Sequence, residues 1–351
     1  MKFNRMELNA FDPDGVGVDN GTYFGLPFEP GTAELVLVSA PWDVTVSYGA
    51  GTAHAPDAVI EASTQLDFHE PLAPGVWRRG IATADVDYAL LEESQRLRSD
   101  AEKVIAHLEG GGSPEDDYAV RKVRRINEGC RAMNPNIGAQ AARWLDAGKT
   151  VGLVGGDHST PYGLIRALGD RHGEFGILHI DAHCDLRDAY EGFEFSHASI
   201  MFNVLRDVPS VKKIAQVAVR DFSGTEAALA ASSARVATFD DLSLAAAMFR
   251  GETWDALCRR IVDALPQEVY VSFDIDGLTF ENCPHTGTPV CGGLTFNQAV
   301  WLLDTLVRSG RRIIGFDVVE VAPAPEAKVD AITGARMLWK LCNLTLKSNG
   351  R

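Results

Sequence analysis

The chain has 351 residues, of which 46% are hydrophobic, so it can bury the core of one large α/β domain or of two smaller domains. Its formal net charge is −15 and no basic cluster offsets this charge, which argues against a nucleic acid or an anionic membrane as partner and favours a small cationic ligand. The six cysteines are scattered, no stretch has the length and apolar character of a membrane span, and the first residues do not resemble a signal peptide; we therefore expect a cytoplasmic protein with reduced thiols.

Residues 1–33 are rich in Gly, Pro, Asn and Asp, as in the segment Phe11-Asp12-Pro13-Asp14-Gly15, and this composition is typical of turns and loops. We interpret residues 1–33 as an N-terminal arm. No linker or change of composition divides the rest of the chain, so residues 34–351 are predicted to form a single domain.

Two strands and three helices are predicted before residue 148. The strands span 34–40 and 80–85, one helix begins at Ala55-Pro56, and two further helices span 90–108 and 116–147. These last two helices are strongly charged, so we interpret them as solvated surface helices around a flexible Gly-rich loop. Residues 47–52 form another Gly-rich loop, which is suited to line a pocket.

Strands and helices alternate regularly from residue 150 onward. The predicted strands are 150–154, 175–180, 213–219, 268–273 and 312–318, and the predicted helices are 161–168, 197–205, 253–265, 296–308 and 331–346. Such alternation indicates a mostly parallel sheet with helices on both faces, that is, a three-layer α/β/α sandwich. Ligands bind beyond the carboxyl ends of the strands in such sheets, and the three motifs described next lie at such ends.

The first motif, Gly155-Gly156-Asp157-His158-Ser159, follows the strand at 150–154. Paired glycines permit a sharp turn and a close approach of the backbone, which would present Asp157 and His158 at the strand end. A turn into a helix that is capped by Ser159 or Thr160 would explain the same pattern without a ligand.

The second motif, Asp181-Ala182-His183-Cys184-Asp185, follows the strand at 175–180. Because side chains alternate along an extended chain, Asp181, His183 and Asp185 share one face. Three metal-binding side chains therefore converge there, although a solvated acidic turn would have a similar sequence.

The third motif, Ser272-Phe273-Asp274-Ile275-Asp276, presents its two aspartates on one face in the same way. By itself, it would also fit the metal-binding pair of a sugar-nucleotide transferase or a capping turn.

Together the motifs supply six candidate metal ligands: His158, Asp181, His183, Asp185, Asp274 and Asp276. Six ligands exceed the four of a tetrahedral zinc, and oxygen-rich ligation with some imidazole suits Mn²⁺ best, with Ni²⁺, Co²⁺ or Fe²⁺ as alternatives. We therefore predict a binuclear site with two divalent ions. Such ions lower the pKa of bound water from 15.7 towards about 7, so hydrolysis at neutral pH is the expected chemistry.

These motifs, with Gly287-Thr288-Pro289 and residues 315–321, strongly resemble the ureohydrolase family of arginases and agmatinases. The resemblance extends from about residue 34 to the C-terminus and implies an arginase-like fold, cleavage of a guanidino C–N bond and release of urea. It further implies that Asp181 is catalytic, that His197 is the proton shuttle, and that Glu320 grips the guanidinium, so that His197 and Glu320 also bind the substrate. Spacing alone would make His197 a surface or capping residue and Glu320 an ordinary surface acid.

The chain departs from the family pattern near the third motif. Thr279 and Phe280 stand where the family usually has Asp-Pro, which would alter the support around Asp276. His285 stands where Gly is common, and it would either flank the pocket or fill a loop.

Arg187 stands two residues after Asp185, where arginases read the amino-acid end of arginine, and we predict that it binds the substrate. A second cation there would repel the far end of agmatine unless Asp188 and Glu191 neutralise it. With the loop at 41–48 and the N-terminal arm, this feature resembles the agmatinase-like branch that includes guanidine and metformin hydrolases, which are linked with nickel.

We therefore expect a hydrolase of guanidine or of a small substituted guanidine, with agmatine or guanidinobutyrate as alternative substrates. Formiminoglutamate hydrolysis and a non-catalytic partner subunit are weaker alternatives, because a partner subunit would be expected to lose ligands. The complete ligand set also disfavours a one-zinc deacetylase. The resemblance implies a homo-oligomer, trimeric or hexameric, and leaves a hetero-oligomer with a related subunit open.

Overall fold

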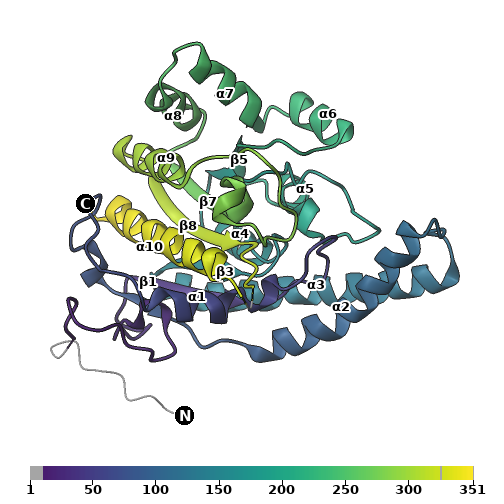
Figure 1. The fold of residues 1–351 in the computed structure, drawn as a ribbon, viewed down its shortest axis with the longest axis horizontal. Coiled ribbons are helices and arrows are strands. Elements are labelled where there is room, and N and C mark those ends of the chain that lie inside the picture. Colours follow the sequence, from purple (N-terminus) through teal and green to yellow (C-terminus); the bar gives the residue numbers. More distant parts are fainter. Residues whose placement is uncertain (1–10, 325, 351) are drawn as a thin grey trace.

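A single parallel sheet of eight strands runs through the middle of the protein (Figure 1). The computed structural model describes residues 11–324 and 326–350. In spatial order the strands are β2 (Ile81–Thr83), β1 (Leu35–Ala40), β3 (Thr150–Gly155), β8 (Arg312–Val319), β7 (Glu268–Asp274), β4 (Phe175–Ile180), β5 (Val211–Val217) and β6 (Val236–Phe239). Every described pair of neighbouring strands is parallel.

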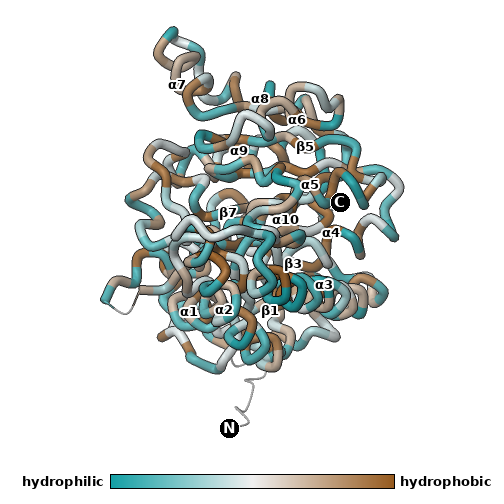
Figure 2. Tube along the Cα trace, turned by 90° about the vertical axis from the view of Figure 1, so that its right-hand side faces the viewer, coloured by the Kyte–Doolittle hydropathy of each residue, from teal (hydrophilic) through white to brown (hydrophobic). Residues whose placement is uncertain are grey.

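Helices cover both faces of this sheet. One face packs against α2 (Tyr88–Glu109), α3 (Asp117–Asp146), α4 (Tyr162–Gly169) and α5 (Ile200–Asp207). The other face packs against α1 (Ala55–Ser63), α8 (Trp254–Asp263), α9 (Phe296–Arg308) and α10 (Val329–Asn349). Hydrophilic and hydrophobic stretches alternate along these outer helices in Figure 2, as expected of helices with one buried face. The predicted three-layer α/β/α sandwich is confirmed.

The central strands read as continuous apolar runs because both of their faces are buried. In β1, Leu35 and Leu37 enter the core on the α10 side, whereas Val36 and Val38 enter the core on the α3 side. Because both faces are buried, hydrophobic runs in the sequence predicted the ends of these strands to within a residue or two of the observed ends.

The register of the four central strands brings their carboxyl ends together. Gly155 of β3 lies one residue beyond Val154, which pairs with Val318 of β8. Asp274 of β7 pairs with Val319 of β8, and the preceding residue of β7 pairs with the last residue of β4. The three predicted motifs, and the stretch before Glu320, therefore meet at one edge of the sheet.

Three elements between residues 220 and 253 escaped sequence prediction: α6 (Gly224–Ser232), β6 and α7 (Asp241–Phe249). The two helices are rich in alanine and bury few side chains, so their apolar residues show no helical periodicity. The strand β6 lies at the edge of the sheet and exposes alternate residues, which leaves it without an apolar run.

The interpretation of α2 and α3 as solvated surface helices was incomplete, because most of their residues are at least partly exposed but each helix also has a buried face. They form a long hairpin that extends beyond the sheet in Figure 1, yet each helix buries a row of side chains. Leu97 and Val104 of α2, with Ile126 and Ile137 of α3, are buried in the core. The charged residues lie on the opposite side of the same helices, which concealed the buried face in the composition.

The described part of the predicted arm, residues 11–33, packs on the body of the protein. Its Phe24 ring lies 5.0 Å from the ring of Trp339 in α10, and Tyr23 and Leu26 join the same core. Residues 1–10 of the predicted arm lie outside the described residues, and the division at residue 33 stays a prediction. In the part of the chain that the structure describes, none of the helices has the length and apolar character needed to cross a membrane.

Candidate metal centre

The turn after β3 brings the first motif into position. A Cβ atom on Gly156 would lie 1.9 Å from the carbonyl oxygen of Trp42, so only glycine fits this close approach of two backbones. The N–H of Asp157 donates to the same carbonyl at 2.8 Å. Ser159 does not cap the following helix, because its hydroxyl donates to Asp157 and α4 begins only at Tyr162. The alternative prediction, in which this segment is only a turn that caps the next helix, is therefore wrong.

His158 lies at the centre of a first group of carboxylates. Its Nδ1 atom is 2.9 Å from Asp181 Oδ2, 3.0 Å from Asp185 Oδ2 and 3.2 Å from Asp274 Oδ2, and it forms a well-oriented hydrogen bond with none of them. The other ring nitrogen, Nε2, lies 2.9 Å from the hydroxyl of Ser272. The contact at Nε2 fixes the ring so that Nδ1 faces the carboxylates.

His183 lies in a second group. Its Nδ1 atom is 3.1 Å from Asp276 Oδ2 and 3.4 Å from Asp181 Oδ1. The other oxygen of Asp276 accepts from the N–H of Ala182 at 3.0 Å, which holds the carboxylate despite the missing Asp-Pro of the family pattern. All six predicted ligands thus lie in two adjoining groups, and Asp181 belongs to both.

The unpaired atoms of these groups fit divalent cations. Nδ1 of His158, Oδ2 of Asp185 and Oδ2 of Asp276 are buried without a hydrogen-bond partner among the described residues. Burial and the neighbouring carboxylate of Asp181 raise the pKa of Asp185 to about 6. Burial, then the charges of Asp276 and Asp181, raise the pKa of Asp274 well above its usual value. Such crowding of buried acids is unfavourable unless cations offset it, and carboxylates with imidazole suit Mn²⁺ or Ni²⁺.

Sequence reasoning missed His179, which also lies in the first group. Its Nε2 atom is 2.8 Å from Asp181 Oδ2, and the amide nitrogen of Gln216 lies 3.2 Å from its Nδ1. These two contacts fix the orientation of the His179 ring against Asp181. His179 therefore orients this carboxylate. It was overlooked because it lies inside the apolar run of β4, although it precedes Asp181 by two residues and so shares its face.

Glu320 directly follows the last residue of β8 and contacts the first motif. Its φ angle of 61° is in the left-handed region, which is strained for a residue other than glycine. Oε1 accepts from the N–H of His158 at 2.9 Å, whereas Oε2 is buried without a partner. Burial, then the nearby charge of Asp157, raise the pKa of Glu320 well above its usual value. A bound cation would stabilise the ionised form.

His197 begins a short 3-10 helix before α5 and is 8% exposed. Burial, and then the charge of His183, lower its pKa to about 3, so the ring is neutral at neutral pH. An imidazole with this pKa is a weak base, so a proton that it transfers would have to come from a group that reacts in the cavity. His197, His183 and Asp185 line a cavity of about 400 Å³ at the carboxyl edge of the sheet.

Arg187 lines the same cavity, but its ionic partner differs from the prediction. Its Nε atom is 3.5 Å from an oxygen of the buried Glu226, and its guanidinium lies over the ring of Tyr190 at 4.6 Å. Glu226 is therefore the acid that offsets Arg187, whereas the predicted Glu191 faces a different cavity. His285 does not line this cavity. Its backbone N–H and its ring both bond to Asp330 of α10, so it connects its loop to that helix.

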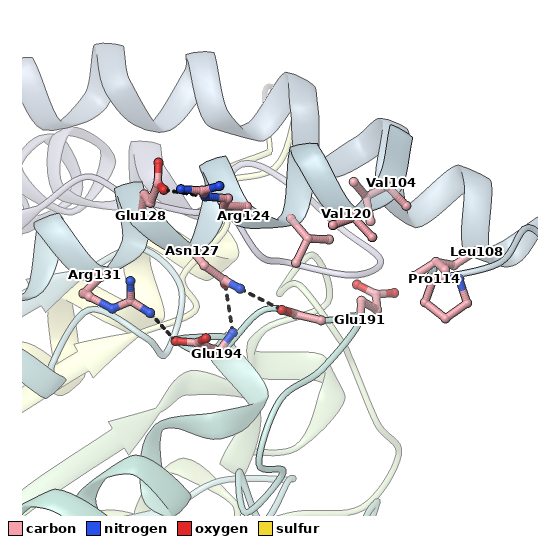
Figure 3. Close-up of a pocket in the computed structure, with 13 residues that line it drawn as sticks. Val104, Leu108, Pro114, Val120, Arg124, Asn127, Glu128, Arg131, Glu191 and Glu194 are labelled. Atoms are coloured by element: carbon pink, nitrogen blue, oxygen red, sulfur yellow. Dashed lines mark hydrogen bonds and ion pairs between the residues drawn. The ribbon is translucent and has the colours of Figure 1, made fainter. Parts of the chain in front are cut away.

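The cavity that contains Glu191 lies between the α2–α3 hairpin and residues 191–194 and measures about 550 Å³ (Figure 3). Most of its polar groups pair with each other: Asn127 bonds to the backbone of Gly192 and Glu194, and Arg131 pairs with Glu194. No group of metal-binding side chains is found there among the described residues. The chemistry therefore belongs to the cavity at the strand ends, although that cavity is smaller.

Comparison with known proteins gives a consistent result. The model of the Arginase family matches residues 33–343. An N(1)-aminopropylagmatine ureohydrolase of Thermus thermophilus is 30% identical over 319 residues, which cover 91% of this chain and 92% of that protein. An agmatinase of Edwardsiella ictaluri is 30% identical over 340 residues, covering 94% and 95%. The structure of proclavaminate amidino hydrolase from Streptomyces clavuligerus has a TM-score of 0.71 at 21% identity and covers 93% of this chain and 97% of its own, which shows a shared fold.

Proposed function

Because the chain belongs to the arginase family, and is a metal-dependent hydrolase of amidine C–N bonds, we propose that it cleaves a guanidino C–N bond and releases urea. One observation carries this proposal: two adjoining groups of metal-binding side chains share Asp181, and Glu320, which accepts from the N–H of His158, keeps its Oε2 without a partner among the described residues. The first feature suits activation of water and the second suits recognition of a planar cation.

The six predicted ligands would hold two divalent ions, and manganese and nickel both suit the donor set. Bound there, the ions would supply a hydroxide nucleophile at neutral pH and stabilise developing negative charge. Glu320 would bind the guanidinium through its free oxygen while His158 N–H holds the other oxygen. His197, which lines the same cavity as His183, would pass a proton from the attacking water to the departing amine.

The proposed substrate is guanidine or a small substituted guanidine. Arg187 places a cation in the cavity, which disfavours a substrate with a second positive charge at its far end. Agmatine or a related amine is the second candidate, because the relatives include agmatinases and because two features reduce the repulsion. Glu226 offsets Arg187, and the exposed Asp221 lines the same cavity and can pair with an ammonium group.

A screen of urea release tests the proposal and separates the candidates. The protein is loaded with Mn²⁺ or with Ni²⁺ and assayed on guanidine, methylguanidine, metformin, guanidinobutyrate, agmatine and arginine. We expect urea from a small guanidine, and a preference for agmatine would support the second candidate. Absence of urea from all six compounds, together with less than about one bound ion per chain by mass spectrometry, would contradict the proposed chemistry.

We further propose that residues 34–351 form the catalytic domain of a cytoplasmic homo-oligomer, trimeric or hexameric. A mixed oligomer with a related subunit is the alternative. Light scattering of the purified protein measures the mass of the assembly, and a monomeric mass at micromolar concentration would contradict a stable oligomer.

A further inference from the structure

Thr45 lies between the metal-binding end of β3 and the proposed proton shuttle. It is fully buried in the loop that follows β1. Its hydroxyl donates to Oδ2 of Asp157 at 3.2 Å and accepts from the backbone N–H of His197 at 3.0 Å. A hydroxyl group has one donor and can accept as well, so both of these contacts can form at once.

The two ends of this bridge belong to different parts of the site. Asp157 directly precedes the ligand His158 and is held by Ser159, whose N–H and hydroxyl donate to its Oδ1 at 3.0 and 2.5 Å. His197 begins the 3-10 helix that leads into α5, 152 residues from Thr45 along the chain. The hydroxyl of Thr45 therefore connects the turn that carries a metal ligand to the backbone that carries the shuttle.

The loop around Thr45 is held in place by other contacts. Arg98 of α2 donates to the carbonyl oxygens of Val44 and Val46, on either side of Thr45. The N–H of Asp43 donates to the hydroxyl of Ser94, also in α2, at 3.0 Å. Loss of the Thr45 hydroxyl should therefore leave the loop in position, so its effect on His197 can be measured separately.

We infer that Thr45 is a positioning residue, which sets the placement of the His197 imidazole relative to the metal-binding end of β3. The inference rests on the proposed role of His197 in proton transfer. The reacting groups of a proton transfer must lie within hydrogen-bond reach, and a displacement of about 1 Å can reduce a rate about 100-fold. A buried hydroxyl that bonds to the His197 backbone limits such displacement without touching the substrate.

The test compares Thr45→Val, which keeps the shape and loses the hydroxyl, with Thr45→Ser, which keeps the hydroxyl. We expect Thr45→Val to lower kcat about 10- to 100-fold with KM within about twofold, and Thr45→Ser to stay within about threefold of the parent. Hydrogen exchange of the metal-free protein gives an independent measurement. The His197 amide should exchange faster in Thr45→Val than in the parent or in Thr45→Ser, because its acceptor is gone.

Thr305→Val is the matched control. Its hydroxyl is also buried and donates to the carbonyl of Trp301 within α9, so this variant should change melting temperature and leave kcat unchanged. The inference is overturned if Thr45→Val keeps the parent kcat, if Thr45→Ser is as slow as Thr45→Val, or if Thr45→Val loses bound metal. A parent protein that releases no urea would instead contradict the proposed function, and the exchange measurement would still test the contact to His197.

Discussion

Replacement of Glu320 by glutamine isolates the proposed recognition of the guanidinium. In Glu320→Gln, Oε1 can still accept from the N–H of His158, while an NH₂ group takes the place of the unpaired Oε2. The substrate cation would then meet donors instead of a carboxylate oxygen. The same change removes a buried charge beside Asp157 and Asp276, so it should not destabilise the metal-free protein.

The expected loss of kcat/KM follows from the one carboxylate oxygen of Glu320, Oε2, that is free to bind the substrate. One hydrogen bond to a charged group contributes about 1.5–3 kcal/mol, and about 1.4 kcal/mol corresponds to a tenfold change. We therefore expect kcat/KM to fall about 10- to 150-fold, mainly through KM, because Glu320 would bind substrate and transition state alike. The melting temperature of the metal-free variant should equal or exceed that of the parent.

The assay measures urea release over a range of substrate concentrations, with circular dichroism to follow thermal unfolding. Glu61→Gln is a control for general loss of negative charge, because Glu61 is an exposed acid that pairs with Lys328 on the surface. A Glu320→Gln variant whose KM and kcat match those of the parent would refute the role of Glu320. A variant that melts at a lower temperature would refute the argument about buried charge.

Three further predictions concern the metals, the pocket wall and pH. Asp181→Asn should abolish urea release and reduce bound metal to about one ion per chain or less, because this carboxylate belongs to both groups. Mass spectrometry measures the bound metal, and two retained ions per chain would contradict the role of Asp181 as a shared ligand. Gly287→Ala would bring a Cβ within 3.0 Å of Glu320 Oε2 and should raise KM about tenfold, whereas Gly173→Ala, with no atom nearby, should have no effect on KM. Burial, followed by the charge of Glu109, raises the pKa of Glu191 from 4.5 to about 7. As the pH rises from 4.5 to 7, this carboxyl group therefore ionises in the unfolded chain before it ionises in the folded protein, and the folded state loses stability. Glu191→Gln should therefore melt higher than the parent at pH 8 and equally at pH 4, and the opposite order would show that the carboxylate is stabilised by the fold.

The alternation of strands and helices could be predicted because central parallel strands are buried on both faces. Leu35 to Val38 form an apolar run for this reason, and the helices after β3 carry a clear buried stripe. The prediction failed where burial is one-sided or slight. The edge strand β6 and the alanine-rich α6 and α7 bury few side chains, so their residues leave no periodic pattern.

The sequence by itself determined the motifs at the strand ends, and with them the six candidate ligands from His158 to Asp276. It could do so because the carboxyl ends of parallel strands meet at one edge, so residues that directly follow buried strands must come close together. Only the tertiary structure decided the partners of these residues. It showed that His179 orients Asp181, that Glu226 pairs with Arg187, and that the Thr45 hydroxyl bonds to His197. Those contacts join side chains from separate elements, and their geometry depends on how the layers pack, which residue spacing along the chain does not encode.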